Sequence, residues 1–172
     1  MSMAATGHIP LREYLETTYR PDREYVDGEI RERNVGKYEH ARIQAVLAGQ
    51  LGAHEQEWGI VGCVAPRVRV AENRVRVPDL VALTAGPQPD VIVEPPILLI
   101  EILSPDDSYS DTQERTRGYQ KMGVGTVWII DPKTRTGRMC SGPEWVEASR
   151  LEVRQRPLYV EFKEIFSQLN PA

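Results

Sequence analysis

RVRVPDLVAL at residues 74–83 and ILLIEILSP at residues 97–105 are the two hydrophobic stretches that decide the fold. The first contains Asp79 and the second contains Glu101, each beside aliphatic residues. An ionised carboxylate is costly in an apolar strand unless a cation or hydrogen-bond donors compensate its charge. A divalent metal ion held by both acids would provide that compensation.

Composition predicts one compact domain over residues 1–172. The chain has 172 residues, of which 41% are hydrophobic, enough for one core and too few for two comfortable ones. The three histidines and the two cysteines, Cys63 and Cys140, are not clustered as metal ligands, which argues against a zinc site or a disulfide framework. A reducing, cytoplasmic location is therefore expected.

Charge and hydropathy exclude other classes. No segment has the length of an apolar membrane span, and the first residues lack the basic and hydrophobic blocks of a signal peptide, so no membrane partner is expected. The formal net charge of -4 argues against broad, nonspecific binding of polyanions, which lysines and arginines drive by releasing counterions. A local basic face is still compatible with this charge.

The N-terminal part predicts a helix and a hairpin at about 9–33, followed by a long helix. Proline at position 10 suits the first turn of a helix, and Asp27-Gly28 suits a tight hairpin turn. From about 38 to 58 the apolar residues recur at helical spacing, with His40 on the inward stripe.

After this helix the apolar residues no longer recur at helical spacing but alternate with polar ones, as in a strand. Residues 67–70 and 74–77 predict a hairpin with valines inward and arginines outward, and its second strand continues to about 83. Residues 97–103 are apolar at both odd and even positions except for Glu101, as in a central strand that is covered on both faces. The remaining segments predict a helix over 111–122, a buried strand over 126–131, short strands around 137–147 and 151–159, and a closing helix at about 161–169.

Several segments, taken together and in this order, resemble the Uma2 (DUF820-type) family. They are EYVDGE at 24–29, His40 on the first long helix, VPDL at 77–80, IEILSP at 100–105, the helix segment 111–119 and GVGTVWIIDP at 123–132. That family belongs to the restriction-endonuclease-like PD-(D/E)XK superfamily. The resemblance implies an α/β fold in which a mixed β-sheet is flanked by helices.

The resemblance also implies a nuclease site. Asp79 and Glu101 match the two acidic members of the nuclease motif, which bind Mg²⁺ or its substitute Mn²⁺, with the carbonyl of Ile102 as a third ligand. Magnesium prefers a few hard oxygen ligands and keeps several waters, one of which can attack a phosphodiester. Glu24 matches a glutamate that such nucleases place beside the metal, and His40 matches a histidine that recurs in the family.

One position departs from the pattern. Where the wider superfamily has a lysine two residues after the glutamate, this chain has Leu103, and where Uma2 proteins carry a lysine on the following helix it has Arg115. A lysine can orient or deprotonate the attacking water, whereas arginine stays protonated and can only position groups and stabilise negative charge. We therefore expect Arg115 to support lowered or altered activity. The sequence leaves open whether Gln113 enters the pocket.

Structural roles are the alternatives for each candidate. Asp79 could cap a turn after Pro78, and Glu101 could form a buried ion pair with Arg115 or Arg117. His40 could be a hydrogen-bonded core histidine, and Glu24 an exposed hairpin charge. The hairpin arginines are either a solvated strand face or a phosphate-contacting surface; they are Arg67, Arg69, Arg74 and Arg76.

Two functions follow as hypotheses. The first is a Mg²⁺-dependent endonuclease that acts on DNA, and a homodimer is preferred because a chain this small needs a second copy to cut both strands in one encounter. The second is a nuclease fold that has lost turnover and serves as a nucleic-acid-binding or protein-interaction module. An enzyme that cuts another phosphate ester is a third reading, because metal chemistry alone does not reveal the substrate.

Overall fold

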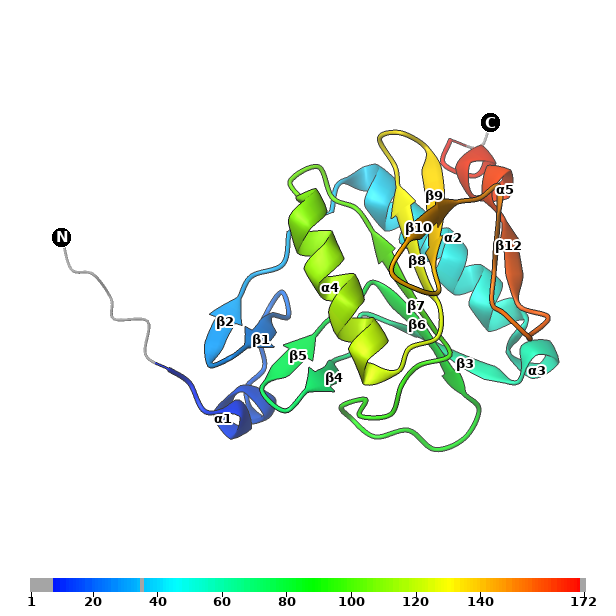
Figure 1. Cartoon of the computed structure of the whole chain (residues 1–172). Coiled ribbons are helices and arrows are strands. Elements are labelled where there is room, and N and C mark those ends of the chain that lie inside the picture. The colour runs from blue at the N-terminus through cyan, green and yellow to red at the C-terminus, as the bar shows by residue number, and fades with distance from the viewer. Residues whose placement is uncertain (1–7, 35, 171–172) are drawn as a thin grey trace.

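A six-stranded mixed sheet forms the centre of the protein, whose computed structural model describes residues 8–34 and 36–170 (Figure 1). In sheet order the strands are β10 (Trp145–Glu147), β9 (Thr136–Cys140), β8 (Val127–Asp131), β7 (Leu98–Ile102), β6 (Leu80–Thr84) and β3 (Ile60–Val64). β7 and β8 run parallel, and the other neighbours are antiparallel. The uninterrupted apolar run around Glu101 is therefore the central strand β7, as predicted.

Helices cover both faces of this sheet (Figure 1). One face packs against α2 (Tyr38–Ala53) and α5 (Phe162–Ser167), and the other packs against α4 (Tyr109–Met122). Because side chains alternate along a strand, Ile100 and Ile102 belong to the α2 core, whereas Leu99 belongs to the α4 core. By the same alternation Glu101 faces α4.

Helix α4 is the crossover that allows β7 and β8 to lie parallel. It begins at a Ser108 cap, whose hydroxyl accepts the Asp111 N–H at 3.1 Å. It ends at Gly123, whose φ of 107° suits a glycine. The helix predicted for 111–122 is thus confirmed, with its start two residues earlier.

A second, four-stranded sheet lies beside the first. It consists of β2 (Glu29–Arg31), β1 (Glu24–Val26), β5 (Arg74–Arg76) and β4 (Val68–Ala71). The predicted turn is present: Asp27 and Gly28 both have positive φ, and β1 pairs with β2. Helix α1 (Leu11–Glu16) covers this sheet through Tyr14, which packs on Tyr25.

The single strand predicted from 74 to 83 is wrong, because the chain leaves one sheet and enters the other within it. β5 ends at Arg76 in the four-stranded sheet, and β6 begins at Leu80 in the six-stranded sheet. Pro78 has no N–H to donate to a ladder, so it suits this junction. Asp79 therefore occupies the junction between the two sheets.

The helix predicted from 38 to 58 is also wrong as one element. It divides into α2 and the short α3 (Glu55–Trp58). The break is at His54, whose N–H bonds to the Leu51 carbonyl three residues earlier at 3.2 Å and so tightens the turn.

Arg76 is a third difference, because it is buried, whereas Arg69 and Arg74 are partly exposed as a solvated strand face requires. The guanidinium groups are all bonded within the chain, to Asp22 for Arg67, the Glu72 carbonyl for Arg69, Asp27 for Arg74 and Glu24 for Arg76. Arg76 is buried because α4 covers this sheet and brings Glu114 against it. In the structure these side chains are therefore engaged by groups of the same chain.

The C-terminal part adds β11 (Arg150–Glu152) and β12 (Tyr159–Glu161), an antiparallel pair, before α5. Hydrogen bonds from Tyr38 and Arg42 of α2 reach carbonyls just after α5. Among the described residues, no helix combines the length and the apolar character that crossing a membrane requires.

Gly137 provides a test of the packing between β9 and α5. A Cβ at Gly137 would lie 2.6 Å from the Phe162 ring, so Gly137→Ala must displace that ring. We expect a loss of about 1–3 kcal/mol in unfolding free energy, measured by urea denaturation. The matched control is Gly142→Ala, because a Cβ there has no neighbour within 4 Å. Equal stability of the two variants would contradict this packing.

Candidate functional site

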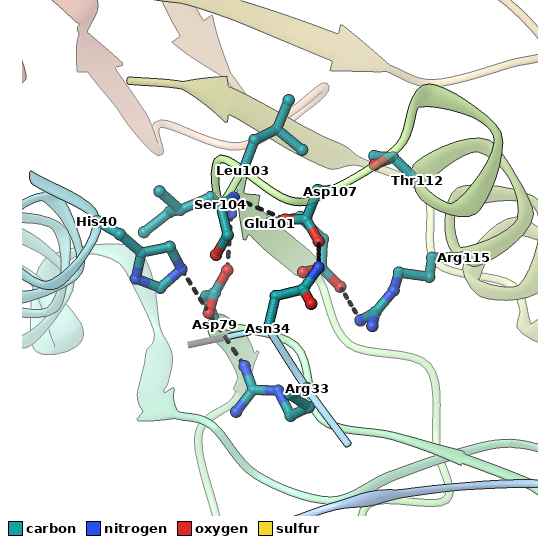
Figure 2. A pocket seen from close by; sticks show the side chains of 11 residues that line it. Arg33, Asn34, His40, Asp79, Glu101, Leu103, Ser104, Asp107, Thr112 and Arg115 are labelled. Atoms are coloured by element: carbon teal, nitrogen blue, oxygen red, sulfur yellow. Dashed lines mark hydrogen bonds and ion pairs between the residues drawn. The ribbon is translucent and has the colours of Figure 1, made fainter. Parts of the chain in front are cut away.

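One pocket lies where β7 ends and contains most of the predicted residues (Figure 2). Its walls come from the connection between β2 and α2, from α2, from the β5–β6 junction, from the end of β7 and from α4. The lining residues are Arg33, Asn34, His40, Asp79, Glu101, Ile102, Leu103, Ser104, Asp107, Thr112 and Arg115. The two acids, distant in sequence, thus share one pocket.

Asp79 is held in place through both of its carboxylate oxygens. Oδ2 accepts the backbone N–H of Ile102 at 2.7 Å. Oδ1 lies 3.1 Å from Arg33 Nη2 and 3.2 Å from His40 Nε2. The backbone carbonyl of Asp79 accepts Nε2 of Gln44, one turn after His40, at 3.0 Å. Asp79 does more than cap a turn, because its bond to Ile102 places its carboxylate beside the end of β7.

Glu101 faces α4 and is 7% exposed. Its Oε1 accepts a hydrogen bond from the Tyr119 hydroxyl and lies 3.7 Å from Arg115 Nη1. Burial raises its pKa from 4.5 to about 7, against the opposing charge of Arg115 and with the support of the Asp79 charge. The ion pair with Arg115 considered above is therefore present, with its charged atoms 3.7 Å apart, and Glu101 also lines the pocket.

Glu24 does not line this pocket. It is 1% exposed, so the reading as an exposed hairpin charge is wrong. Its Oε1 accepts Arg115 Nη1 at 2.9 Å and the Val77 N–H at 3.0 Å, and its Oε2 accepts Arg76 Nη1 at 2.9 Å. Arg76 also donates to Glu114. Glu24 thus fixes the guanidinium of Arg115 from behind the pocket.

His40 bonds to the acid that it was predicted to accompany. Its side chain is 13% exposed, and Nε2 faces Asp79. Burial lowers the pKa of His40, but the hydrogen bond and charge of Asp79 outweigh burial and raise that pKa overall. This favours His40 as a donor to Asp79.

A short strap, Arg33 and Asn34, crosses the pocket (Figure 2). Arg33 contacts Asp79 on one side, and Asn34 Nδ2 donates to Asp107 Oδ1 at 2.7 Å on the other. The second oxygen of Asp107 accepts the Ser104 N–H at 2.6 Å, which closes the loop after β7. The strap therefore joins the β5–β6 junction to the β7–α4 loop.

The donor set fits a hard cation that keeps most of its own water. Among residues 8–34 and 36–170, no cluster of three or more histidine, cysteine or acidic side chains is arranged to hold a metal, so a closed protein cage is absent there. Asp79 and Glu101 offer carboxylate oxygens in one pocket. Magnesium is commonly held by one or two carboxylates together with waters and substrate phosphate.

The structure brings together five of the six side chains or ligands predicted from the sequence and adds others. The five are His40, Asp79, Glu101, Ile102 and Arg115; Gln113, left open, is not among the lining residues. The sequence analysis missed Arg33, Asn34, Asp107 and the hydroxyl of Tyr119. Tyr119 follows Arg115 by one helical turn, a spacing that could have indicated it. The irregular segment containing the strap gave no such signal.

Glu24→Gln tests the buried network behind the pocket. The variant removes the buried carboxylate that Arg76 and Arg115 share and leaves them only Glu114 and the more distant Glu101, so we expect a loss of about 3–5 kcal/mol in unfolding free energy. Urea denaturation measures it. The control is Glu32→Gln, since Glu32 is 77% exposed and pairs at the surface with Arg23. A Glu24→Gln protein as stable as the Glu32→Gln protein would contradict the network.

The pKa of Glu101 predicts a pH dependence of stability in metal-free buffer. Because the folded-state pKa is raised to about 7, the native state holds this proton more tightly than the unfolded state. The resulting stabilisation is complete below about pH 4.5 and is lost as pH rises through about 7.

Glu101→Gln removes this pH-dependent contribution to stability and keeps an acceptor for the Tyr119 hydroxyl. We expect the wild type to lose on the order of 1 kcal/mol or more relative to Glu101→Gln between pH 5 and 8, as measured by urea denaturation in EDTA. Glu147→Gln, at an exposed position of β10, controls for a change of charge alone. Parallel pH profiles of wild type and Glu101→Gln would refute the assignment.

Comparisons with known proteins identify the family and the fold. The Uma2 family model, described as "Putative restriction endonuclease", matches residues 11–168. A crystal structure from Anabaena variabilis ATCC 29413, described as a "putative nuclease belonging to DUF820", has a TM-score of 0.79 and 23% identity, and the match covers 94% of this chain and 99% of that one. No curated protein matches the chain. The predicted mixed sheet flanked by helices, in a nuclease-like fold, is confirmed, and since the family model spans most of the sequence, the chain belongs to the Uma2 family.

Proposed function

We propose that this protein is a metal-dependent endonuclease that hydrolyses phosphodiester bonds of DNA. The observation that carries the proposal is the meeting of Asp79 and Glu101 in one pocket, in a chain that belongs to the family described as "Putative restriction endonuclease". Two carboxylates, one from the junction between the sheets and one from the central strand, lie beside guanidinium groups and so suit a site for a cation and a phosphate.

Mg²⁺, with Mn²⁺ as a substitute, is the proposed cofactor. Asp79 and Glu101 would hold it through their carboxylates, and the carbonyl of Ile102 is the proposed third ligand. When bound, the ion would lower the pKa of a water molecule and polarise the scissile phosphate. The raised pKa of Glu101 supports this assignment, because a carboxylate buried without full compensation favours a cation.

The remaining residues orient the acids and stabilise charge. The Ile102 N–H and His40 fix the Asp79 carboxylate, and the Tyr119 hydroxyl fixes Glu101. Arg115, held by Glu24, presents a permanent positive charge that stabilises the negative charge developing on the phosphate.

Contacts to the DNA backbone are proposed for the basic side chains around the pocket. The arginines of β4 and β5 are engaged within the fold, as described above. Arg33 lines the pocket, and Lys37 is exposed on the same connection, just before α2. Phosphate contacts of this kind give an affinity that falls as salt rises.

Arg115 also favours the second candidate function, a nuclease fold that binds nucleic acid or protein with little or no turnover. An arginine stays protonated, so it cannot take a proton from the attacking water as a lysine can. Both candidate functions allow metal binding, so they are distinguished by whether the protein cleaves DNA.

Plasmid nicking with Mg²⁺ or Mn²⁺ tests the endonuclease. We expect wild type to nick supercoiled DNA, and Glu101→Ala to lose activity by about a hundredfold or more because a proposed cation ligand is removed. Glu147→Ala, which removes an exposed glutamate of β10, should keep wild-type activity. Equal nicking by wild type and Glu101→Ala would reveal a contaminant or a different site.

Arg115→Lys separates the two candidates. If the protein is a weakened nuclease, restoring a lysine at this position should raise nicking severalfold, because lysine can serve as a proton acceptor when its pKa is lowered. Mn²⁺ binding by calorimetry, without nicking by either wild type or Arg115→Lys, would support the binding module and refute the endonuclease.

A further inference from the structure

We propose that Arg33 is an internal counter-ion of the site: it neutralises Asp79 while no metal is bound, competes with the metal for that carboxylate, and turns to the substrate phosphate when the metal takes its place. This inference rests on the proposed function and assigns a role to a residue that sequence analysis did not single out.

The contacts of Asp79 show why Arg33 and a metal ion would compete for one carboxylate oxygen, Oδ1. Oδ2 is engaged by the Ile102 N–H, a backbone group that cannot move without disturbing β7. Oδ1 faces Arg33 Nη2 at 3.1 Å and His40 Nε2 at 3.2 Å. A metal ion that approaches Oδ1 therefore meets a positive charge already in position, and the two cations repel each other.

The charges of the pocket favour an arrangement in which the metal ion replaces Arg33 at the Asp79 carboxylate and does not bind beside it. Its lining contains three carboxylates, Asp79, Glu101 and Asp107, and two guanidinium groups, Arg33 and Arg115. Counting these five groups alone, with Glu101 ionised as metal binding would require, the formal charge is minus one, so a divalent ion would bring it to plus one. One phosphodiester charge restores neutrality, and a guanidinium released from Asp79 has the planar donors that a phosphate accepts.

The two arginines of the pocket differ in their freedom to move. Arg115 is held at 2.9 Å by Glu24, which is itself buried and bonded to Arg76. The two side chains are about equally exposed, at 22% for Arg33 and 21% for Arg115, but Arg33 extends from an irregular connection whereas Arg115 lies on α4. Within the described part of the chain, Asp79 is the one carboxylate that Arg33 contacts.

The strap gives Arg33 a short path to a substrate. Its neighbour Asn34 is bonded to Asp107 across the pocket, so the backbone at this point stays over the pocket while the Arg33 side chain turns. Arginine reaches different partners by rotation of its stem alone, without movement of the strap.

The test measures two affinities that should change in opposite directions. Mn²⁺ binding is measured by titration calorimetry, and binding of a short DNA duplex is measured by fluorescence anisotropy in Ca²⁺. For Arg33→Ala we expect Mn²⁺ to bind about three- to tenfold more tightly, because a competing charge is gone, and DNA to bind about three- to tenfold more weakly, because a phosphate contact is lost.

Two variants serve as controls. Arg33→Lys keeps the charge and should return Mn²⁺ affinity toward the wild-type value. Arg31→Ala removes an equal charge two positions away, from a side chain that is 46% exposed and lies near Glu29, and should leave Mn²⁺ affinity within about twofold of wild type. Thermal unfolding verifies that each variant is folded.

Each outcome decides the inference. Tighter Mn²⁺ binding together with weaker DNA binding in Arg33→Ala supports it. Unchanged or weaker Mn²⁺ binding in Arg33→Ala, in a background where wild type binds Mn²⁺ and nicks DNA, overturns the inference and leaves the endonuclease intact. If wild type neither binds Mn²⁺ nor nicks DNA, the proposed function fails, and this role of Arg33 fails with it.

Discussion

The hydrogen bond from the Ile102 N–H to the Asp79 carboxylate, 2.7 Å long, is the contact on which the arrangement of the site depends. It joins the junction between the two sheets to the end of the central strand. Since Ile102 directly follows Glu101, this bond brings Asp79 beside the second acid of the pocket. Gln44 secures the same junction from α2, because its Nε2 donates a hydrogen bond to the Asp79 carbonyl. The register of β6 against β7, in which Leu80 pairs with Ile100, already places Asp79 and Glu101 near each other, and these contacts then fix the Asp79 residue in its place.

Burying acids in this way requires nearby positive charge, and the chain supplies it mostly as arginine. Glu24 is neutralised by Arg76 and Arg115, and Asp79 is approached by Arg33. Arginine suits these positions because it remains protonated when buried and donates from a planar group to two acceptors at once. The same property limits the chemistry, since a group that stays protonated cannot act as a base. The site therefore combines firm electrostatic support with the absence of a lysine at the position of Arg115.

Particular residues show how far the sequence could be interpreted and where it failed. Glu101 stood out because it is one charge within an apolar run. The apolar run indicated a central strand, and the charge indicated a compensating group nearby. Glu24 was misjudged because a two-strand hairpin predicts an exposed position, and the sequence does not reveal that β5 and α4 cover it. Arg33 was missed because irregular segments carry no periodicity, so nothing local indicates where a side chain points.

The sequence by itself determined the elements and their order: the hairpin at Asp27-Gly28, the central strand around Glu101, the crossover helix and the family to which these motifs belong. These features depend on neighbouring residues, through turn conformation, alternation and helical spacing. Only the tertiary structure decided that Pro78 separates two sheets, that Arg76 turns inward to Glu24, and that the strap reaches Asp79 and Asp107. Those contacts join residues far apart in the chain, and their energies depend on which surfaces meet when the core closes, a property that no local pattern contains.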